Sequence, residues 1–91
     1  MLPIIWSDEA RSNLLAIVHY VAERNPTAAI ELGQAIERST WPLPEHPHLF
    51  RPGRVRGTRE IVVHPNYIVV YRVELACIKV LSVLHVRQQY P

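Results

Sequence analysis

The sequence contains one cysteine, no long apolar run and no internal repeat. Cys77 therefore has no partner for an internal disulfide, which favours a reducing compartment, and we expect it to be a buried strand residue. No stretch approaches the roughly 18 to 20 apolar residues that cross a bilayer. The first residues also lack the basic region and the small-residue cleavage site of a signal peptide. We therefore expect a cytoplasmic protein with no membrane partner.

Histidine occurs at five positions, but the usual metal-binding patterns are missing. His46 and His48 are two residues apart in a proline-rich stretch, while His64 and His85 are distant from them in sequence. Neither a cysteine pair nor a His-Glu helix motif accompanies them. The sequence therefore predicts no metal site and no cofactor.

The overall composition is typical of a folded protein. The chain has 91 residues, of which 48% are hydrophobic and 20% are charged, a balance typical of globular proteins rather than disordered ones. This length allows one hydrophobic core, so we expect a single domain over residues 1–91. Its stability should be modest, because a chain of this size buries only roughly 60–65% of its unfolded surface.

Charge is distributed unevenly along the chain. Residues 1–45 contain three basic and six acidic side chains, whereas residues 46–91 contain seven basic and two acidic ones. Nine of the ten basic residues are arginine, whose planar guanidinium suits bidentate contacts with carboxylate or phosphate. This pattern indicates an acidic or polyanionic partner on one face, the alternative being ordinary solvated charge.

The first half of the sequence predicts a strand followed by two helices. Residues 2–6 have the pattern of a short strand, and Ser7 is a typical N-cap with acidic residues after it. Asn25 and Pro26 end this helix and begin a second one, as N-cap and first helical residue. Two helices joined by a tight turn form a hairpin. Gly33, inside the second helix, predicts a close approach of the two helices.

The second half predicts a loop and then three strands. Residues 42–57 contain four prolines, two glycines and three arginines, which favours a loop. The β-rich runs 58–64, 67–73 and 77–86 are separated by short turns and predict an antiparallel meander with 67–73 at its centre. The expected fold is α+β, in the order β-α-α-β-β-β, with the helical hairpin packed on a small antiparallel sheet. We expect this sheet to bury four residues: Ile61, Val69, Tyr71 and Val80.

Several further side chains are assigned packing or pairing roles. Trp6 and Trp41 flank the helical hairpin and are expected to pack, and Tyr20 is expected in the core. An ordinary role for Arg59 and Glu60 is a cross-strand ion pair that contributes little to stability. Arg72 is expected to pair with Glu60 or Glu74.

Four blocks of the sequence resemble the RelE/ParE superfamily of toxins. They are residues 6–10 with the helix that follows, residues 53–63 entering the second strand, residues 67–73 as central strand, and residues 78–91 as last strand and tail. The resemblance implies the fold described above and a cognate antitoxin, encoded alongside, whose C-terminal segment wraps the toxin in a hetero-oligomer. It also implies one of two activities: RelE-like members cleave mRNA on the ribosome, and ParE-like members poison DNA gyrase.

The sequence lacks two arginines that are typical of the ribonucleases of this family. Cleavage without a metal requires a base, an acid and cations that stabilise charge on phosphorus. RelE-like enzymes typically have an arginine just after the aromatic residue of the central strand, where this chain has Ile68, and another near Val86. If the chain were such an enzyme, its catalytic residues would be His85, Tyr90 and Arg59.

The ParE-like alternative depends on binding and requires no catalytic residues. The resemblance then makes Arg54, Arg56, Arg59 and Arg87 the expected contacts, either to gyrase and DNA or to acidic antitoxin side chains. We favour a noncatalytic gyrase inhibitor. A ribosome-dependent mRNA endoribonuclease is the alternative, and a third possibility is an antitoxin-binding scaffold that has lost toxicity.

Overall fold

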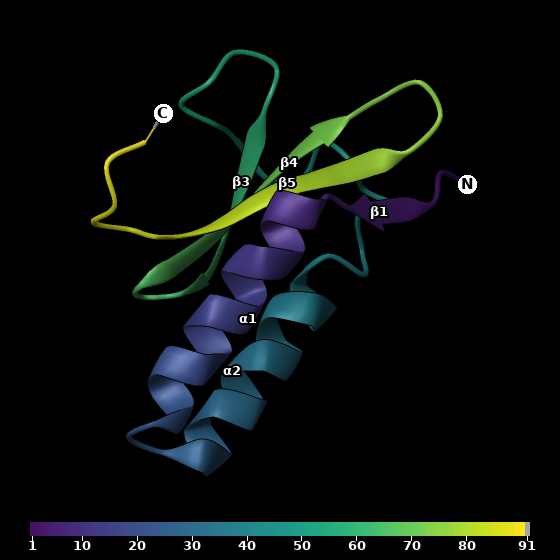
Figure 1. The fold of residues 1–91 in the computed structure, drawn as a ribbon. Coiled ribbons are helices and arrows are strands. Elements are labelled where there is room, and N and C mark those ends of the chain that lie inside the picture. Colours follow the sequence, from purple (N-terminus) through teal and green to yellow (C-terminus); the bar gives the residue numbers. More distant parts are fainter. Residues whose placement is uncertain (91) are drawn as a thin grey trace.

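A computed structural model describes residues 1–90, so that Pro91 of the expected domain lies outside the described residues. Two helices pack on one face of a five-stranded sheet (Figure 1). Neither helix is long and apolar enough to cross a membrane. The α+β class and the predicted order are confirmed, with one additional short strand: β1 Ile4–Trp6, α1 Asp8–Ala22, α2 Pro26–Ser39, β2 Arg51–Pro52, β3 Arg59–His64, β4 Tyr67–Val73 and β5 Ile78–His85.

The strand order of the sheet is β1-β5-β4-β3-β2, which puts β4 at the centre as predicted. Strands β3, β4 and β5 form the expected antiparallel meander. Two details differ from the expected antiparallel sheet. β1 pairs in parallel with β5, which is possible because most of the chain lies between them and no tight turn has to join them. β2 forms inside the predicted loop, where Pro52 is tolerated because the strand is at the sheet edge.

The helices begin at the predicted caps. The Ser7 hydroxyl accepts a hydrogen bond from the Ala10 N–H at 3.0 Å, and the Asn25 side chain accepts one from the Ala28 N–H at 3.1 Å. Ser7 also donates to the Leu81 carbonyl of β5 at 2.9 Å. The same residue therefore starts α1 and ties its beginning to the sheet.

The main core lies between the helices and the sheet. The four residues expected to be buried are at most 4% exposed. The predicted close approach of the helices is also present, since a Cβ added to Gly33 would lie only 3.2 Å from Val18 Cγ2. Tyr20 and Trp41 differ from prediction, because their side chains are 51% and 66% exposed. Tyr20 lies near the C-terminal end of α1, and Trp41 lies in the turn that follows α2.

Tyr71 connects the central strand to the proline-rich segment after α2. Its hydroxyl donates to the Pro47 carbonyl at 2.7 Å, and its ring meets Phe50 edge-on with centroids 6.5 Å apart. Arg59, opposite Tyr71 in the sheet, donates to the carbonyls of Phe50 and His48 at 2.7 and 3.3 Å. Burial raises the pKa of Tyr71, although the charge of Arg59 and a backbone hydrogen bond oppose the shift.

Replacing Tyr71 by Phe should lower the free energy of unfolding at neutral pH by about 1–2 kcal/mol, because the Pro47 carbonyl loses its donor. Tyr71 should also contribute to alkaline unfolding. Its pKa in the folded protein exceeds the ordinary value of 10.0, so above that pH the unfolded chain ionises first and the folded state loses stability. Urea unfolding of both proteins at neutral pH and above pH 10 measures the two effects. An equally steep alkaline loss in Tyr71→Phe would contradict this role.

Candidate functional site

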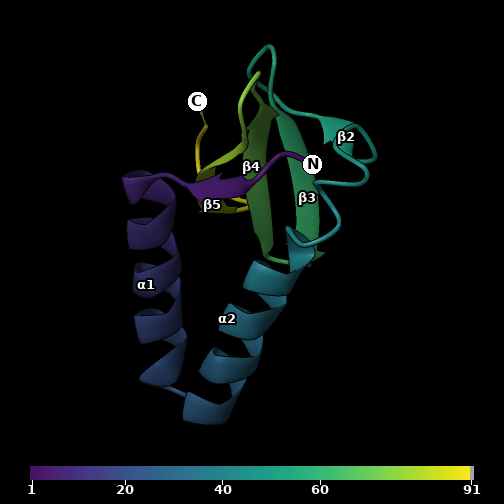
Figure 2. The same ribbon diagram turned by 90° about the vertical axis from the view of Figure 1, so that its right-hand side faces the viewer.

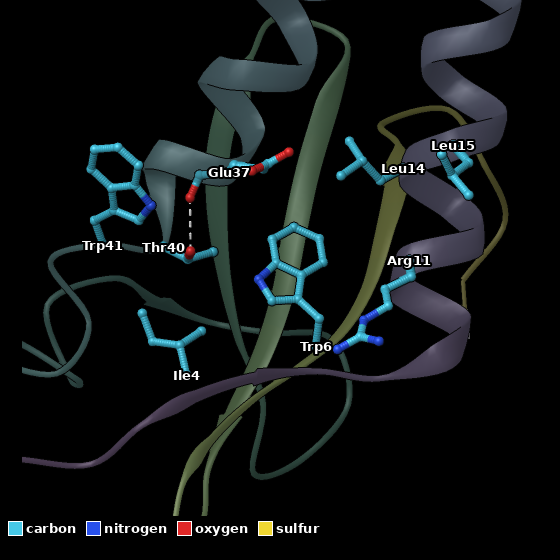
Figure 3. Close-up of a pocket in the computed structure, with 8 residues that line it drawn as sticks. All are labelled: Ile4, Trp6, Arg11, Leu14, Leu15, Glu37, Thr40 and Trp41. Atoms are coloured by element: carbon cyan, nitrogen blue, oxygen red, sulfur yellow. Dashed lines mark hydrogen bonds between the residues drawn. The ribbon is translucent and has the colours of Figure 1, made fainter.

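An open cleft lies at the end of the helical hairpin that faces the sheet. The two helices diverge towards the sheet, and β1 crosses the opening (Figure 2). The cleft has a volume of about 450 Å³ and is lined mainly by apolar side chains (Figure 3), from Ile4, Trp6, Arg11, Leu14, Leu15, Glu37, Thr40 and Trp41. Leu15 and Trp41 are 60% and 66% exposed. A small protein thus presents a concentrated apolar surface to solvent, which is typical of a binding site.

Local structure explains why this cleft stays open. Ile4 and Trp6 project on the helix side of the sheet, opposite Ile78 and Val80 in the pairing with β5. Helix α2 ends at Ser39 and is capped by Thr40, whose hydroxyl donates to the Glu37 carbonyl at 2.8 Å. The chain then turns away and leaves Trp41 at the rim. The prediction that Trp41 packs was wrong, and Trp6 is only partly buried within the cleft wall.

The opposite face of the sheet is organised by a buried carboxylate. Glu60 is 4% exposed. Its Oε1 accepts hydrogen bonds from Arg51 Nε and Nη2 at 3.2 and 3.1 Å, and its Oε2 accepts one from the Arg54 N–H at 3.2 Å. Of the two residues for which a cross-strand ion pair was expected, Glu60 forms one with Arg51 of β2. Arg59 forms none within residues 1–90 and points to the opposite face of the sheet. Glu60 instead fixes the arginine-rich loop between β2 and β3.

The C-terminal tail covers the same face. Tyr90 packs with Leu81 and Val86 against a small cluster of buried side chains, Ile68, Val70 and Leu84. Arg54 Nη1 donates to the Tyr90 carbonyl at 3.4 Å, and its guanidinium lies 5.9 Å from the centre of the Tyr90 ring. Loop and tail therefore meet over the sheet, with Arg54 between the Glu60 carboxylate and the Tyr90 ring.

The four arginines predicted as contacts separate into two groups. Arg54 and Arg56 belong to the loop before β3, and Arg87 follows β5; all three are exposed. Arg59 lies on the helix side, where it binds loop carbonyls.

The structure adds further cations to the face opposite the helices. Besides Arg51, these are Arg72 and Lys79, which are direct neighbours across β4 and β5. Arg72 pairs with Glu74 at 3.3 Å, one of its two expected partners.

The three residues proposed for a ribonuclease are not brought together. Nδ1 of His85 accepts a hydrogen bond from the Arg87 N–H at 3.1 Å, and the ring meets Tyr67 edge-on at 5.3 Å. In the sheet, Arg59 lies opposite Tyr71 and His85 lies opposite Tyr67. Tyr67 and Tyr71 are four residues apart along β4, so Arg59 and His85 are offset by the same distance along the sheet. That offset corresponds to roughly 13 Å. Tyr90 lies on the other face of the sheet.

The remaining reactive groups are potential metal ligands and the thiol of Cys77. Within residues 1–90, no three His, Cys, Asp or Glu side chains gather in a way that could hold a metal ion. Cys77 is buried, as predicted. Burial, a hydrogen bond to Glu74 and the charge of Glu74 raise the pKa of its thiol. The thiol is therefore expected to stay protonated and unreactive.

Solved structures share this architecture. The chain aligns with a structure of the chromosomal ParDE system of Pseudomonas aeruginosa with a TM-score of 0.84 and 27% identity, covering 96% of this chain and 98% of that one. A YoeB/ParE toxin from Agrobacterium tumefaciens has the same fold with a TM-score of 0.68 and 12% identity, covering 98% and 100% of the two chains. The fold is therefore that of the RelE/ParE superfamily.

Sequence comparison identifies the family within this superfamily. The family described as "ParE toxin of type II toxin-antitoxin system, parDE" matches residues 4–90. The candidate toxin Y4kP of Sinorhizobium fredii is 35% identical over 89 residues, which cover 97% of this chain and 92% of that protein. Toxin RelE2 of Caulobacter vibrioides is 27% identical, with 93% and 96% covered. The chain belongs to the ParE toxin family of type II toxin–antitoxin systems.

Glu60 gives a testable measure of how the arginine loop is held. Replacing it by Gln keeps its shape and removes its charge, which should lower the free energy of unfolding by about 1.5–3 kcal/mol, as expected for hydrogen bonds to a charged group. Glu74→Gln is the matched control, because its exposed pair with Arg72 should contribute less than about 1 kcal/mol. Urea unfolding compares the two variants. Equal, small losses would contradict a central role for Glu60.

Proposed function

We propose that this ParE-family toxin inhibits DNA gyrase by binding, through the arginines of the loop before β3 and of the C-terminal tail, and that its antitoxin neutralises it by docking in the apolar cleft. The observation that carries the proposal is the separation of His85, Arg59 and Tyr90. A general acid or base must lie within hydrogen-bond reach of the reacting group, and cations must surround the same phosphate. Each of the three side chains instead has a separate structural partner.

The arginines of this loop and of the tail suit binding to an anionic target. Neither Arg56 nor Arg87 has an ion-pair partner within residues 1–90, so both are available for new contacts. Arg51 and Arg54 are held in fixed positions by Glu60, which reduces the entropy lost on binding. Guanidinium groups bind carboxylate and phosphate alike, which fits a complex of gyrase with DNA.

Antitoxin binding is assigned to the cleft because of its apolar lining. The exposed Leu15 and Trp41 would be removed from water by a partner with apolar side chains. Family membership supports an antitoxin as partner. We expect the free toxin to be poorly soluble and its complex with the antitoxin to be stable.

A ribosome-dependent endoribonuclease is the second candidate, and one observation favours it. His85 lines a hollow of about 470 Å³ between α1 and the ends of β4 and β5, together with Tyr67, Asn66 and Gln88. A histidine in such a hollow has room to meet a ligand. In this case His85 would act in proton transfer with an incomplete phosphate clamp, because Ile68 occupies the position of the central-strand arginine.

The two candidates predict opposite results for His85→Ala. A gyrase inhibitor needs no proton transfer, so this variant should remain as toxic as the wild type when induced without antitoxin. Arg56→Ala and Arg87→Ala should weaken toxicity, because charge-assisted contacts contribute about 1.5–3 kcal/mol each. Arg24→Ala, an exposed arginine at the far end of the helical hairpin, is the matched control and should remain toxic. Growth after induction is the measurement.

Two further readouts make the result decisive. Circular dichroism of each variant excludes loss of toxicity through unfolding. Mapping of mRNA ends in the induced cells detects cleavage directly. A folded, nontoxic His85→Ala, with wild-type cleavage that the variant lacks, would favour the ribonuclease, for which loss of a general acid or base costs on the order of 10²- to 10⁴-fold in rate.

A further inference from the structure

The two charged residues of the cleft lie at the helix ends that disfavour them. Arg11 is the fourth residue of α1, close to the end at which the helix dipole is positive. Glu37 is the third residue from the end of α2, where the dipole is negative. Cations are stabilised at helix C-termini and anions at N-termini. Both side chains therefore have the sign opposite to the one that stabilises the helix.

Neighbouring charges follow the stabilising rule. Asp8 and Glu9 lie in the first turn of α1, and Arg38 lies in the last turn of α2. Arg11 and Glu37 are exposed, and neither forms an ion pair within residues 1–90. They come from opposite walls of the cleft, with the Trp6 indole drawn between them (Figure 3). Their position is thus not explained by the stability of the free toxin.

We propose that Arg11 and Glu37 determine which antitoxin segment docks in the cleft, and in which direction. This inference rests on the proposed docking of the antitoxin in the cleft. The segment is amphipathic: its apolar side chains contact Trp6, Leu14 and Trp41, a carboxylate faces Arg11 on the α1 side, and a cation faces Glu37 on the α2 side. A segment lying in the reverse direction would place like charges opposite each other.

Charges at the rim of an apolar interface act mainly on specificity and on the association rate. Contacts with the apolar floor are tolerant of direction, because dispersion and burial are not directional. Two opposite charges on facing walls favour one direction of the bound segment, because a segment in the other direction meets repulsion at both walls. Such a device is useful where several toxins with similar clefts meet several antitoxins.

A swap of the two charges separates this role from a structural one. Arg11→Glu combined with Glu37→Arg keeps the net charge and puts a favourable charge at each helix end. The swapped toxin should therefore melt at or above the temperature of the wild type. Its affinity for the antitoxin encoded beside it should fall by about tenfold or more, mostly through slower association, because attraction at each wall becomes repulsion. Its affinity should also rise with salt, where that of the wild type falls.

The measurement is a fluorescence titration with the purified antitoxin, because the two tryptophans of the chain, Trp6 and Trp41, both line the cleft. The matched control swaps Glu31 and Arg38, two exposed charges of α2 that are not part of the cleft. Its affinity should stay within about twofold of the wild type, as expected for surface charges without a partner.

The Leu15→Asp variant shows whether a negative result concerns the proposed docking site or only the role of Arg11 and Glu37. Unchanged affinity in this variant, with no change in fluorescence on binding, would mean that the antitoxin docks elsewhere, and both the proposed site and the inference would be overturned. If Leu15→Asp abolishes binding but the Arg11 and Glu37 swap has no effect, the cleft remains the site and the charge inference alone is overturned. A swapped toxin that melts well below the wild type would indicate a structural role and likewise overturn it.

Discussion

The central strand β4 is buried on both faces, and most of the architecture follows from this constraint. Ile68, Val69, Val70 and Tyr71 are at most 1% exposed although their side chains alternate between the two sides of the sheet. One side has to be covered by the helices and the proline-rich segment. The other has to be covered by the arginine-rich loop and the C-terminal tail, because the chain contains no further helix in residues 1–90.

The two candidate binding surfaces differ because different segments cover the two faces of the sheet. On the helix side, α1 and α2 diverge towards the sheet, so the cover is incomplete beside β1 and an apolar cleft remains. On the opposite side, the cover consists of a short loop and a tail that Glu60 and Arg54 hold in place. The first surface suits apolar contacts with an antitoxin, and the second suits contacts between arginines and an anionic target.

Local signals in the sequence were sufficient to predict both helices and all the strands except β2. Ser7 and Asn25 act as caps through their own side chains, so the helix starts could be predicted from a few residues. The apolar run 67–73 predicted a strand buried on both faces, because a half-exposed strand would alternate. The resemblance to a known family supplied the expected partner and the two expected activities.

The remaining features depend on tertiary contacts that no local pattern encodes. The parallel pairing of β1 and the formation of β2 require partners far away in sequence. Glu60 could be expected to pair with an arginine, but Arg51 and Arg54 become its partners only once β2 lies beside β3. Trp41 and Leu15 have apolar side chains that would ordinarily suggest burial, and both are exposed because they line the open cleft.

We propose that this toxin acts by binding gyrase and not by cleaving RNA. The most direct test is DNA supercoiling by purified gyrase at increasing concentrations of wild-type toxin, with ribosome-bound mRNA treated with the same toxin preparation. We expect loss of supercoiling, its recovery on addition of the antitoxin, and intact mRNA. Undiminished supercoiling together with antitoxin-sensitive cleavage of the mRNA would contradict it.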